Sequence, residues 1–213
     1  MFARLIFIVG ILISQATFSQ GKDLNLPDLG DRVSGVISLE QEKLLGQSFV
    51  EQVYAQAPLM NDPIIQEYTE LLIYRLSESS QVEDRDFTII LIDEKSLNAF
   101  AAPGGVIGVN GGLFLNAGNE AQLSSVLGHE LAHLSQRHFA RRVLQGRDTN
   151  LASSLVMVSA IALALVSNNP TAFLTGPAAL AQQQLRYSRI FEREADRYGF
   201  NNLIAAGYDP SAM

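Results

Sequence analysis

The sequence predicts an α+β fold that is mostly helical, with a small β-sheet beside a central helix. Apolar residues recur at helical spacing over most of the chain, whereas only two short runs, near its middle, are typical of strands. The 213 residues, 47% of them hydrophobic, suffice for one domain with a sizeable core.

Two helices are predicted before the strands. Ser38 and Gln41 form a capping-box pattern ahead of apolar residues at helical spacing, which predicts a helix over about residues 39–56. Asp62 followed by Pro63 is typical of a helix start, and apolar residues continue at helical spacing beyond it. We therefore expect a second helix that begins at Pro63.

The two strand-like runs follow. Residues 86–92 are rich in β-branched and aromatic side chains and end at a polar turn, which predicts a strand. Residues 106–109 lie between a Pro-Gly-Gly and an Asn-Gly-Gly sequence, so we expect a strand with a tight turn on either side.

Two longer helices are predicted in the second half. Asn119 as N-cap, with Gln122 at the third position, opens a helix that we expect to run to about Leu144. A last helix is expected from about Ala178 to Ala206, with Gly207 as its C-terminal cap.

Two further segments leave alternatives open. Residues 155–166 are nearly all apolar, a length more typical of a buried helix than of a membrane span, although a hairpin that touches lipid or a partner stays possible. Asp209 and Pro210 resemble the start of yet another helix three residues before the end at Met213. We expect that the natural protein continues beyond this point.

The first 20 residues have the pattern of a signal peptide. Arg4 supplies positive charge, residues 5–13 are apolar, and small residues follow at Ser14, Ala16 and Ser19. We expect cleavage between Ala16 and Gln20, with residues 21–213 forming one domain outside the cytoplasm.

Charge and cysteine content exclude several kinds of site. The net charge of −7 argues against nucleic acid or an anionic membrane surface as the main partner. The chain has no cysteine, so disulfides and thiolate metal sites are excluded. A transition-metal site must therefore consist of histidine and carboxylate ligands.

The sequence His129-Glu130-Leu131-Ala132-His133 predicts half of a catalytic zinc site. Histidines four residues apart on a helix can reach one ion, and the intervening glutamate lies beside the open coordination position. A catalytic zinc usually has three protein ligands and a water, so a third ligand must come from elsewhere.

A carboxylate is the expected third ligand. His138 is five residues past His133, which turns it roughly 140° around a continuous helix, so we expect it not to share the metal. Glu192 and Asp196 share one face of the last helix. We expect Glu192 to bind the metal and Asp196 to accept a hydrogen bond from His129, fixing its tautomer.

The neighbouring charged residues have simpler interpretations. Glu194 is expected on a solvated face with Arg193 and Arg197, so it ranks well below Glu192 as a ligand. Four arginines near the end of the histidine helix are expected to face solvent and offset the helix dipole: Arg137, Arg141, Arg142 and Arg147.

This donor set predicts hydrolysis of peptide bonds. Zinc held by two imidazoles and one carboxylate activates a water and polarises a carbonyl. Glu130 would take the proton of the water and pass it to the leaving amine.

The chain resembles the zinc metallopeptidases of the CAAX-prenyl-protease family. The matching segments are residues 26–28, 57–63, 98–101, 125–133, 136–138 and 192–197. The resemblance implies a gluzincin-like domain that binds one zinc ion through His129, His133 and Glu192, with Glu130 as base and Asp196 behind a ligand. It also suggests that residues 106–109 are an edge strand that pairs with substrate, although plain core structure is about as consistent with those residues.

Within that family the resemblance is closest to periplasmic members that act in outer-membrane protein assembly. It implies a periplasmic endopeptidase that degrades misfolded or stalled outer-membrane proteins and assists their assembly, with unfolded proteins and the assembly machinery as partners. Those relatives have a further histidine and a helical-repeat domain beyond the length of this chain. The main alternative is a chaperone or scaffold whose zinc site is regulatory or inactive. A structural zinc site is disfavoured, because it would need four protein ligands.

Overall fold

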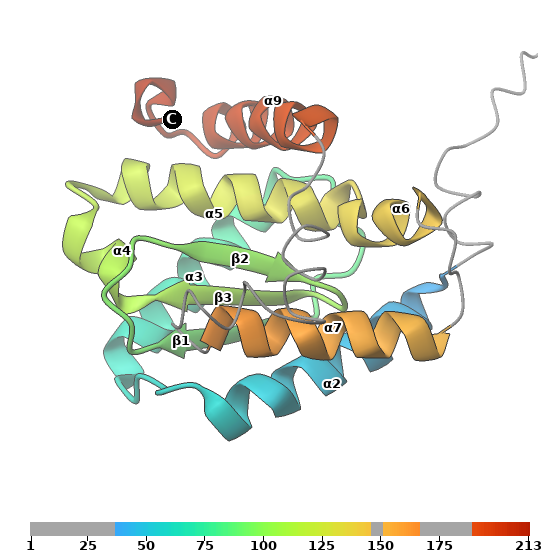
Figure 1. The fold of residues 1–213 in the computed structure, drawn as a ribbon. Coiled ribbons are helices and arrows are strands. Elements are labelled where there is room, and N and C mark those ends of the chain that lie inside the picture. The colour runs from blue at the N-terminus through green and yellow to red at the C-terminus, as the bar shows by residue number, and fades with distance from the viewer. Residues whose placement is uncertain (1–36, 146–150, 167–188) are drawn as a thin grey trace, which may run out of the picture.

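The computed structural model describes residues 37–145, 151–166 and 189–213 (Figure 1). The predicted signal peptide, residues 1–20, and residues 178–188 of the predicted last helix lie outside the described residues. The elements, in chain order, are α2 (Leu39–Gln56), α3 (Pro63–Glu78), β1 (Thr88–Ile92), β2 (Ala99–Ala102), β3 (Val106–Asn110), α4 (Gly111–Asn116), α5 (Glu120–Ser135), α6 (His138–Gln145), α7 (Leu151–Val166), α9 (Arg189–Ala205) and the short 3₁₀ helix η1 (Pro210–Ala212). The predicted class, mostly helical with a small sheet, is confirmed.

The three strands form a mixed sheet in the order β1-β3-β2. β3 pairs in parallel with β1 and antiparallel with β2. The suggestion that residues 106–109 form an edge strand is therefore wrong, because β3 is bonded on both sides. β2 is one of the two edge strands instead, and its position next to β3 follows from the hairpin turn, where Gly104 and Gly105 both have positive φ.

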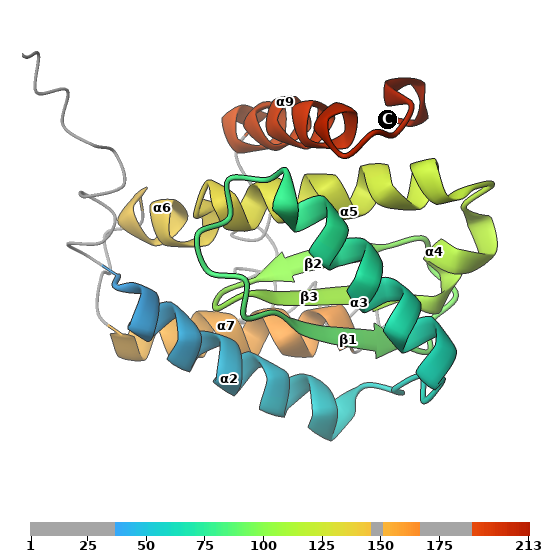
Figure 2. The same cartoon turned by 180° about the vertical axis from the view of Figure 1, so that it is seen from behind.

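Each face of the sheet is covered by helices. Ile90 and Ile92 of β1 pack in a cluster with residues of α2, α6 and α7, whereas Ile89 and Leu91 pack in a second cluster with α3, α4 and α5. This alternation follows from the two-residue period of a strand. Figures 1 and 2, seen from opposite sides, show α7 and α3 on opposite faces of the sheet.

Local capping signals explain the starts of α2 and α3. Ser38 and Gln41 bond to each other's backbone N–H in a capping box, and the Asp62 side chain accepts hydrogen bonds from the first turn of α3. The predicted bounds of α2 and the predicted start of α3 are both confirmed.

The predicted continuous helix from residue 119 to about Leu144 is wrong, because α5 ends at Ser135 and α6 begins at His138. Between them, Arg137 has a left-handed backbone with φ of 49°. Its guanidinium donates to the Ile37 carbonyl oxygen at 2.7 Å and pairs with the Glu42 carboxylate at 3.0 Å. Arg137 and Glu42 are largely buried, so the expectation that Arg137 faces solvent is also wrong.

The buried carboxylate of Glu42 is held against α5 by this arginine. Burial raises the pKa of Glu42, although the charge and the hydrogen bonds of Arg137 act in the opposite direction. The Arg137–Glu42 pair thus fixes the break between α5 and α6 to the start of α2.

The last helix, α9, packs against α5 (Figure 1). Its predicted end is confirmed: Gly207 has φ of 85°, its N–H donates to the Ile204 carbonyl, and the Tyr208 N–H donates to the Leu203 carbonyl. These two bonds form a Schellman motif. The Asp209 side chain then caps η1 by accepting from the Ser211 N–H at 2.9 Å.

The apolar segment expected over residues 155–166 lies in α7, which packs against α2. Val158 is buried in the core, whereas Val156 is exposed. Among the residues that the structure describes, no helix is long and apolar enough to cross a membrane.

Candidate metal centre

Two histidines of α5 lie side by side because they are one helical turn apart. The Nε2 atoms of His129 and His133 are 3.0 Å apart. The side chain of His133 is almost fully buried, whereas that of His129 is about one-fifth exposed. Both nitrogens therefore face the same point at the surface of α5.

Glu192 of α9 faces the two histidines. Its carboxylate oxygens lie 3.5 Å from His129 Nε2 and 3.9 Å from His133 Nε2. One donor atom from each of the three residues can be chosen so that all three atoms lie within 4.8 Å of one another. Two imidazole nitrogens and one carboxylate oxygen suit a metal such as zinc, and the half-exposed Glu192 leaves the point open to solvent.

A close approach of α9 to α5 brings Glu192 within reach. A Cβ placed on Gly199 of α9 would lie 3.0 Å from the backbone N and Cα of His129. Any larger residue at this position would push the two helices apart. Gly199 thus sets the distance between the helix that carries the histidines and the helix that carries the carboxylate.

Gly199→Ala should weaken zinc binding by about tenfold or more, because the added methyl displaces α9 from His129 and a misplaced ligand loses its bond to the metal. Competition with a chromogenic chelator measures this affinity. Gly112→Ala is a matched control, since its Cβ would meet the Lys95 carbonyl, and neither residue belongs to the metal donors or to the cavity walls. Both variants should be less stable, but only Gly199→Ala should lose affinity; equal zinc affinities in the two would contradict this role.

Asp196 lies behind His129. Its carboxylate oxygen is 3.0 Å from His129 Nδ1. An Nδ1–H that donates to this carboxylate leaves the lone pair on Nε2, which is the atom that faces Glu192 and His133. The structure thus brings together all four residues that the sequence predicts around the metal.

Glu130, the predicted base, follows His129 on α5 and bonds to the backbone of β2. It is half-buried and accepts a hydrogen bond from the backbone N–H of Ala101. Burial, with a smaller contribution from the charge of Glu192, raises the pKa of Glu130 to about 8, although the Ala101 N–H lowers it. In the metal-free protein this carboxylate is therefore a stronger base than an exposed glutamate.

His138 is the residue whose position differs most from the prediction. The break at Arg137 brings it beside His133, so that the two Nδ1 atoms are 2.9 Å apart and His138 is fully buried. Burial and the nearby His129 and His138 lower the pKa of His133 to about 3. His133 is therefore neutral at physiological pH, as a metal ligand must be.

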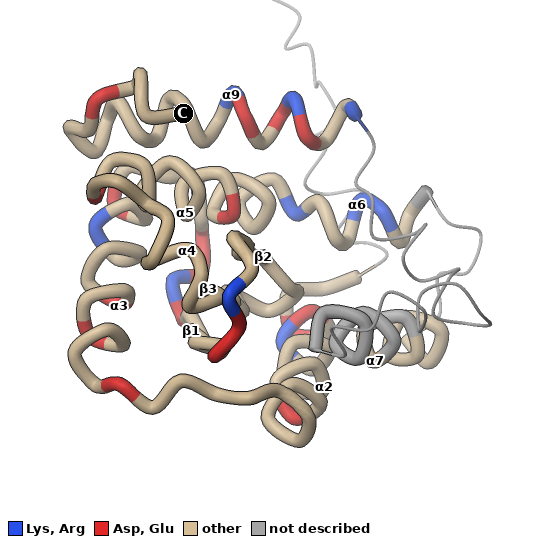
Figure 3. The backbone as a smooth tube through the Cα atoms, turned by 60° about the vertical axis from the view of Figure 1, so that its left-hand side comes forward, with Lys and Arg blue, Asp and Glu red and all other residues tan. Residues whose placement is uncertain are grey.

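Glu194 is also placed differently from the prediction. Figure 3 shows acidic and basic positions alternating along the first half of α9, and helical spacing alone left Glu194 on the solvated side. Its side chain is instead only 19% exposed, 3.4 Å from His138 Nε2 and 3.0 Å from Arg141. Burial lowers the pKa of His138 to about 4, although Glu194 raises it. Arg141 thus pairs with Glu194 rather than facing solvent.

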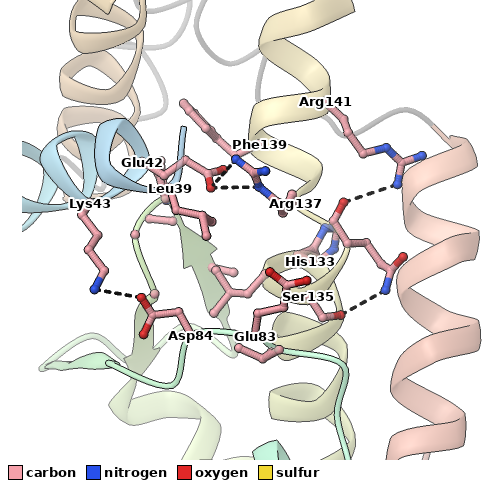
Figure 4. A pocket seen from close by; sticks show the side chains of 18 of the residues that line it. Leu39, Glu42, Lys43, Glu83, Asp84, His133, Ser135, Arg137, Phe139 and Arg141 are labelled. Carbon is pink, nitrogen blue, oxygen red and sulfur yellow. Dashed lines mark hydrogen bonds and ion pairs between the residues drawn. The ribbon is translucent and has the colours of Figure 1, made fainter. Parts of the chain in front are cut away.

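A cavity of about 320 Å³ lies beside His133 (Figure 4). Its walls are the end of α5, the turn after β2, the start of α2, the loop before β1 and Tyr198 of α9. Apolar walls come from Leu39, Val82 and Phe139, and charged groups lie around them. The cavity therefore borders β2 and one of the candidate metal donors, His133.

Comparison with known proteins gives a consistent set of relatives. Residues 63–213 match the model of the family described as Peptidase family M48. The chain is 34% identical over 197 residues to the putative beta-barrel assembly-enhancing protease of Vibrio cholerae, covering 92% of this chain and 41% of that protein. It is 37% identical over 193 residues to the beta-barrel assembly-enhancing protease of Escherichia coli strain K12, covering 88% and 39%. It is also 30% identical over 182 residues to the mitochondrial metalloendopeptidase OMA1 of Schizosaccharomyces pombe, covering 83% and 51%. The chain thus spans about two fifths of the bacterial relatives.

Proposed function

Because the chain belongs to peptidase family M48, we propose that it is a zinc-dependent endopeptidase of the cell envelope that acts on misfolded or stalled outer-membrane proteins. The observation that carries this proposal is the convergence of His129, His133 and Glu192 from two helices, with Glu130 beside them. The relatives named as proteases and metalloendopeptidases support the same activity.

The residues divide the chemistry between them. His129, His133 and Glu192 would hold one zinc ion, which when bound would lower the pKa of a water and polarise the substrate carbonyl. Asp196 holds His129 in the tautomer that a ligand needs. Glu130 takes a proton from the attacking water and delivers it to the amine that leaves, so no residue forms a bond to the substrate.

The substrate binds as an added strand along the edge of β2. The hydrogen bond from Ala101 N–H to Glu130 shows that backbone groups on this edge face the base. An extended peptide paired there passes directly beside the metal donors. The adjacent cavity then receives a substrate side chain, and its apolar walls favour an apolar or aromatic one.

The proposed location is the periplasm. The relatives named beta-barrel assembly-enhancing proteases support outer-membrane proteins as substrates and their assembly machinery as a partner. The signal-peptide pattern of residues 1–20 supports export.

Metal dependence tests this function. The purified, zinc-loaded chain should cleave a urea-unfolded β-barrel protein after dilution, lose cleavage with a chelator, and regain it with zinc but not with magnesium. A chaperone with an inactive site would suppress aggregation of the same substrate equally well with and without chelator, and would release no fragments. That second result would overturn the proposed activity.

A further inference from the structure

We propose that His138 and Glu194 are positioning residues for the metal centre, which act through His133 in the way that Asp196 acts through His129. The inference rests on the proposed zinc site. It adds to the His129–Asp196 contact a second, buried series of hydrogen bonds. This series runs from His133 through His138 and Glu194 to Arg141, and it links α5, α6 and α9.

The geometry assigns a direction to each hydrogen bond. His133 Nε2 faces His129 and Glu192, so metal binding there leaves the single proton of the neutral ring on Nδ1. That N–H points at His138 Nδ1, 2.9 Å away. His138 Nδ1 must therefore accept, which places the proton of His138 on Nε2.

Glu194 completes the series. His138 Nε2–H faces the Glu194 carboxylate oxygen at 3.4 Å, and the same oxygen accepts from Arg141 at 3.0 Å. The carboxylate thus favours the His138 tautomer whose Nδ1 can accept from His133. Through one intervening ring, Glu194 has the same effect on His133 that a directly bonded carboxylate would have.

Packing holds the intervening ring in place. The His138 ring is fully buried and stacks on Phe191 of α9, with ring centroids 4.6 Å apart and an interplanar angle of 14°. The backbone turn at Arg137 brings the ring to this position. A buried polar ring with both nitrogens directed at named partners is typical of a residue that orients a ligand.

Zinc affinity, measured by chelator competition at constant pH, tests the proposal. His138→Leu should bind zinc about 10–100-fold more weakly, because the His133 N–H loses its acceptor. His138→Asn should recover most of this loss, since the Asn Oδ1 occupies the place of Nδ1. Val143→Ala, which removes buried packing from the same helix, should lower stability and leave the affinity unchanged.

Several outcomes would overturn the inference while leaving the proposed function intact. Wild-type affinity in His138→Leu would do so, as would equal losses in His138→Leu and His138→Asn. If His138→Leu does not fold, nitrogen-15 spectra of the zinc-loaded wild-type chain decide the question, because it has three histidines. The expected signature is a protonated Nε2 and an unprotonated Nδ1 on His138. The opposite tautomer would refute the proposed series of hydrogen bonds. Failure of the wild-type protein to bind zinc would instead refute the proposed function.

Discussion

Glu130→Gln should lower the rate of peptide cleavage by at least ~10²–10⁴-fold and leave zinc bound, because the variant keeps all three donors and loses only the base. The amide is nearly isosteric with the carboxylate and can still accept from the Ala101 N–H. Cleavage of an unfolded β-barrel protein and metal content, measured on the same preparation, check the two parts. Retained cleavage would mean that another group accepts the proton.

The same substitution should make the metal-free protein more stable at high pH. Burial raises the pKa of Glu130 from an ordinary value near 4.5 to about 8. Between these values the folded protein keeps a proton that the unfolded chain has released, so the stability of the wild type falls as the pH rises. Gln has no such penalty, so relative to acidic pH we expect its advantage in unfolding free energy to grow to about 4 kcal/mol at pH 8.

Urea unfolding of the two metal-free proteins at pH 5 and pH 8 measures this effect. The difference in unfolding free energy between Glu130→Gln and the wild type should be small at pH 5 and larger at pH 8. Glu67→Gln, on an exposed part of α3, is the control and should show no such trend. If the difference in unfolding free energy between the two proteins becomes smaller as the pH rises, the raised pKa of Glu130 is contradicted.

Glu192→Ala should weaken zinc binding by roughly 10³-fold, because the metal would lose one of three protein ligands and the only negatively charged one. Asp196→Ala should cost less, about 10–100-fold, because it removes a hydrogen bond to His129 rather than a ligand. Chelator competition gives both values. The expected order of affinity is wild type, then Asp196→Ala, then Glu192→Ala.

Two substitutions sharpen the interpretation of Glu192. Glu67→Ala removes an equivalent charge from a remote, exposed position and should bind zinc like the wild type. Glu192→Asp keeps the charge with a shorter reach and should lie between wild type and Glu192→Ala. Unchanged zinc in Glu192→Ala would show that the third ligand is a different residue.

The starts of α2, α3 and α5 and the end of α9 were predictable because their signals are local. The capping box at Ser38 and the left-handed glycine at position 207 act within a few residues of the chain. β2 was not predicted, because its sequence Ala-Phe-Ala-Ala has little strand propensity and forms a strand by pairing with β3. The central place of β3 depends on its pairing with both β1 and β2.

The grouping of His129, His133 and Glu192 was predictable for a different reason. His129 and His133 share a helix, and the lack of cysteine left a carboxylate as the remaining kind of ligand. The Glu192 carboxylate lies close to both imidazoles, as this reasoning requires. His138 and Glu194 escaped because helical spacing was extended through Arg137. Arg137 adopts a left-handed backbone although it is neither glycine nor asparagine, so the sequence carries no local signal for this turn. The Arg137 side chain is held by Glu42, 95 positions earlier in the chain.

The donors on α5 and α9 have a consequence for the mechanics of the domain. His133 and Glu192 are about 60 residues apart in sequence, so a bound ion acts as a cross-link that closes a long loop of the chain. By the chain-entropy estimate for a covalent link, such closure is worth ~4 kcal/mol. A bound metal would then also hold α9 against α5. Removal of the metal would loosen α9 before it disturbs the sheet.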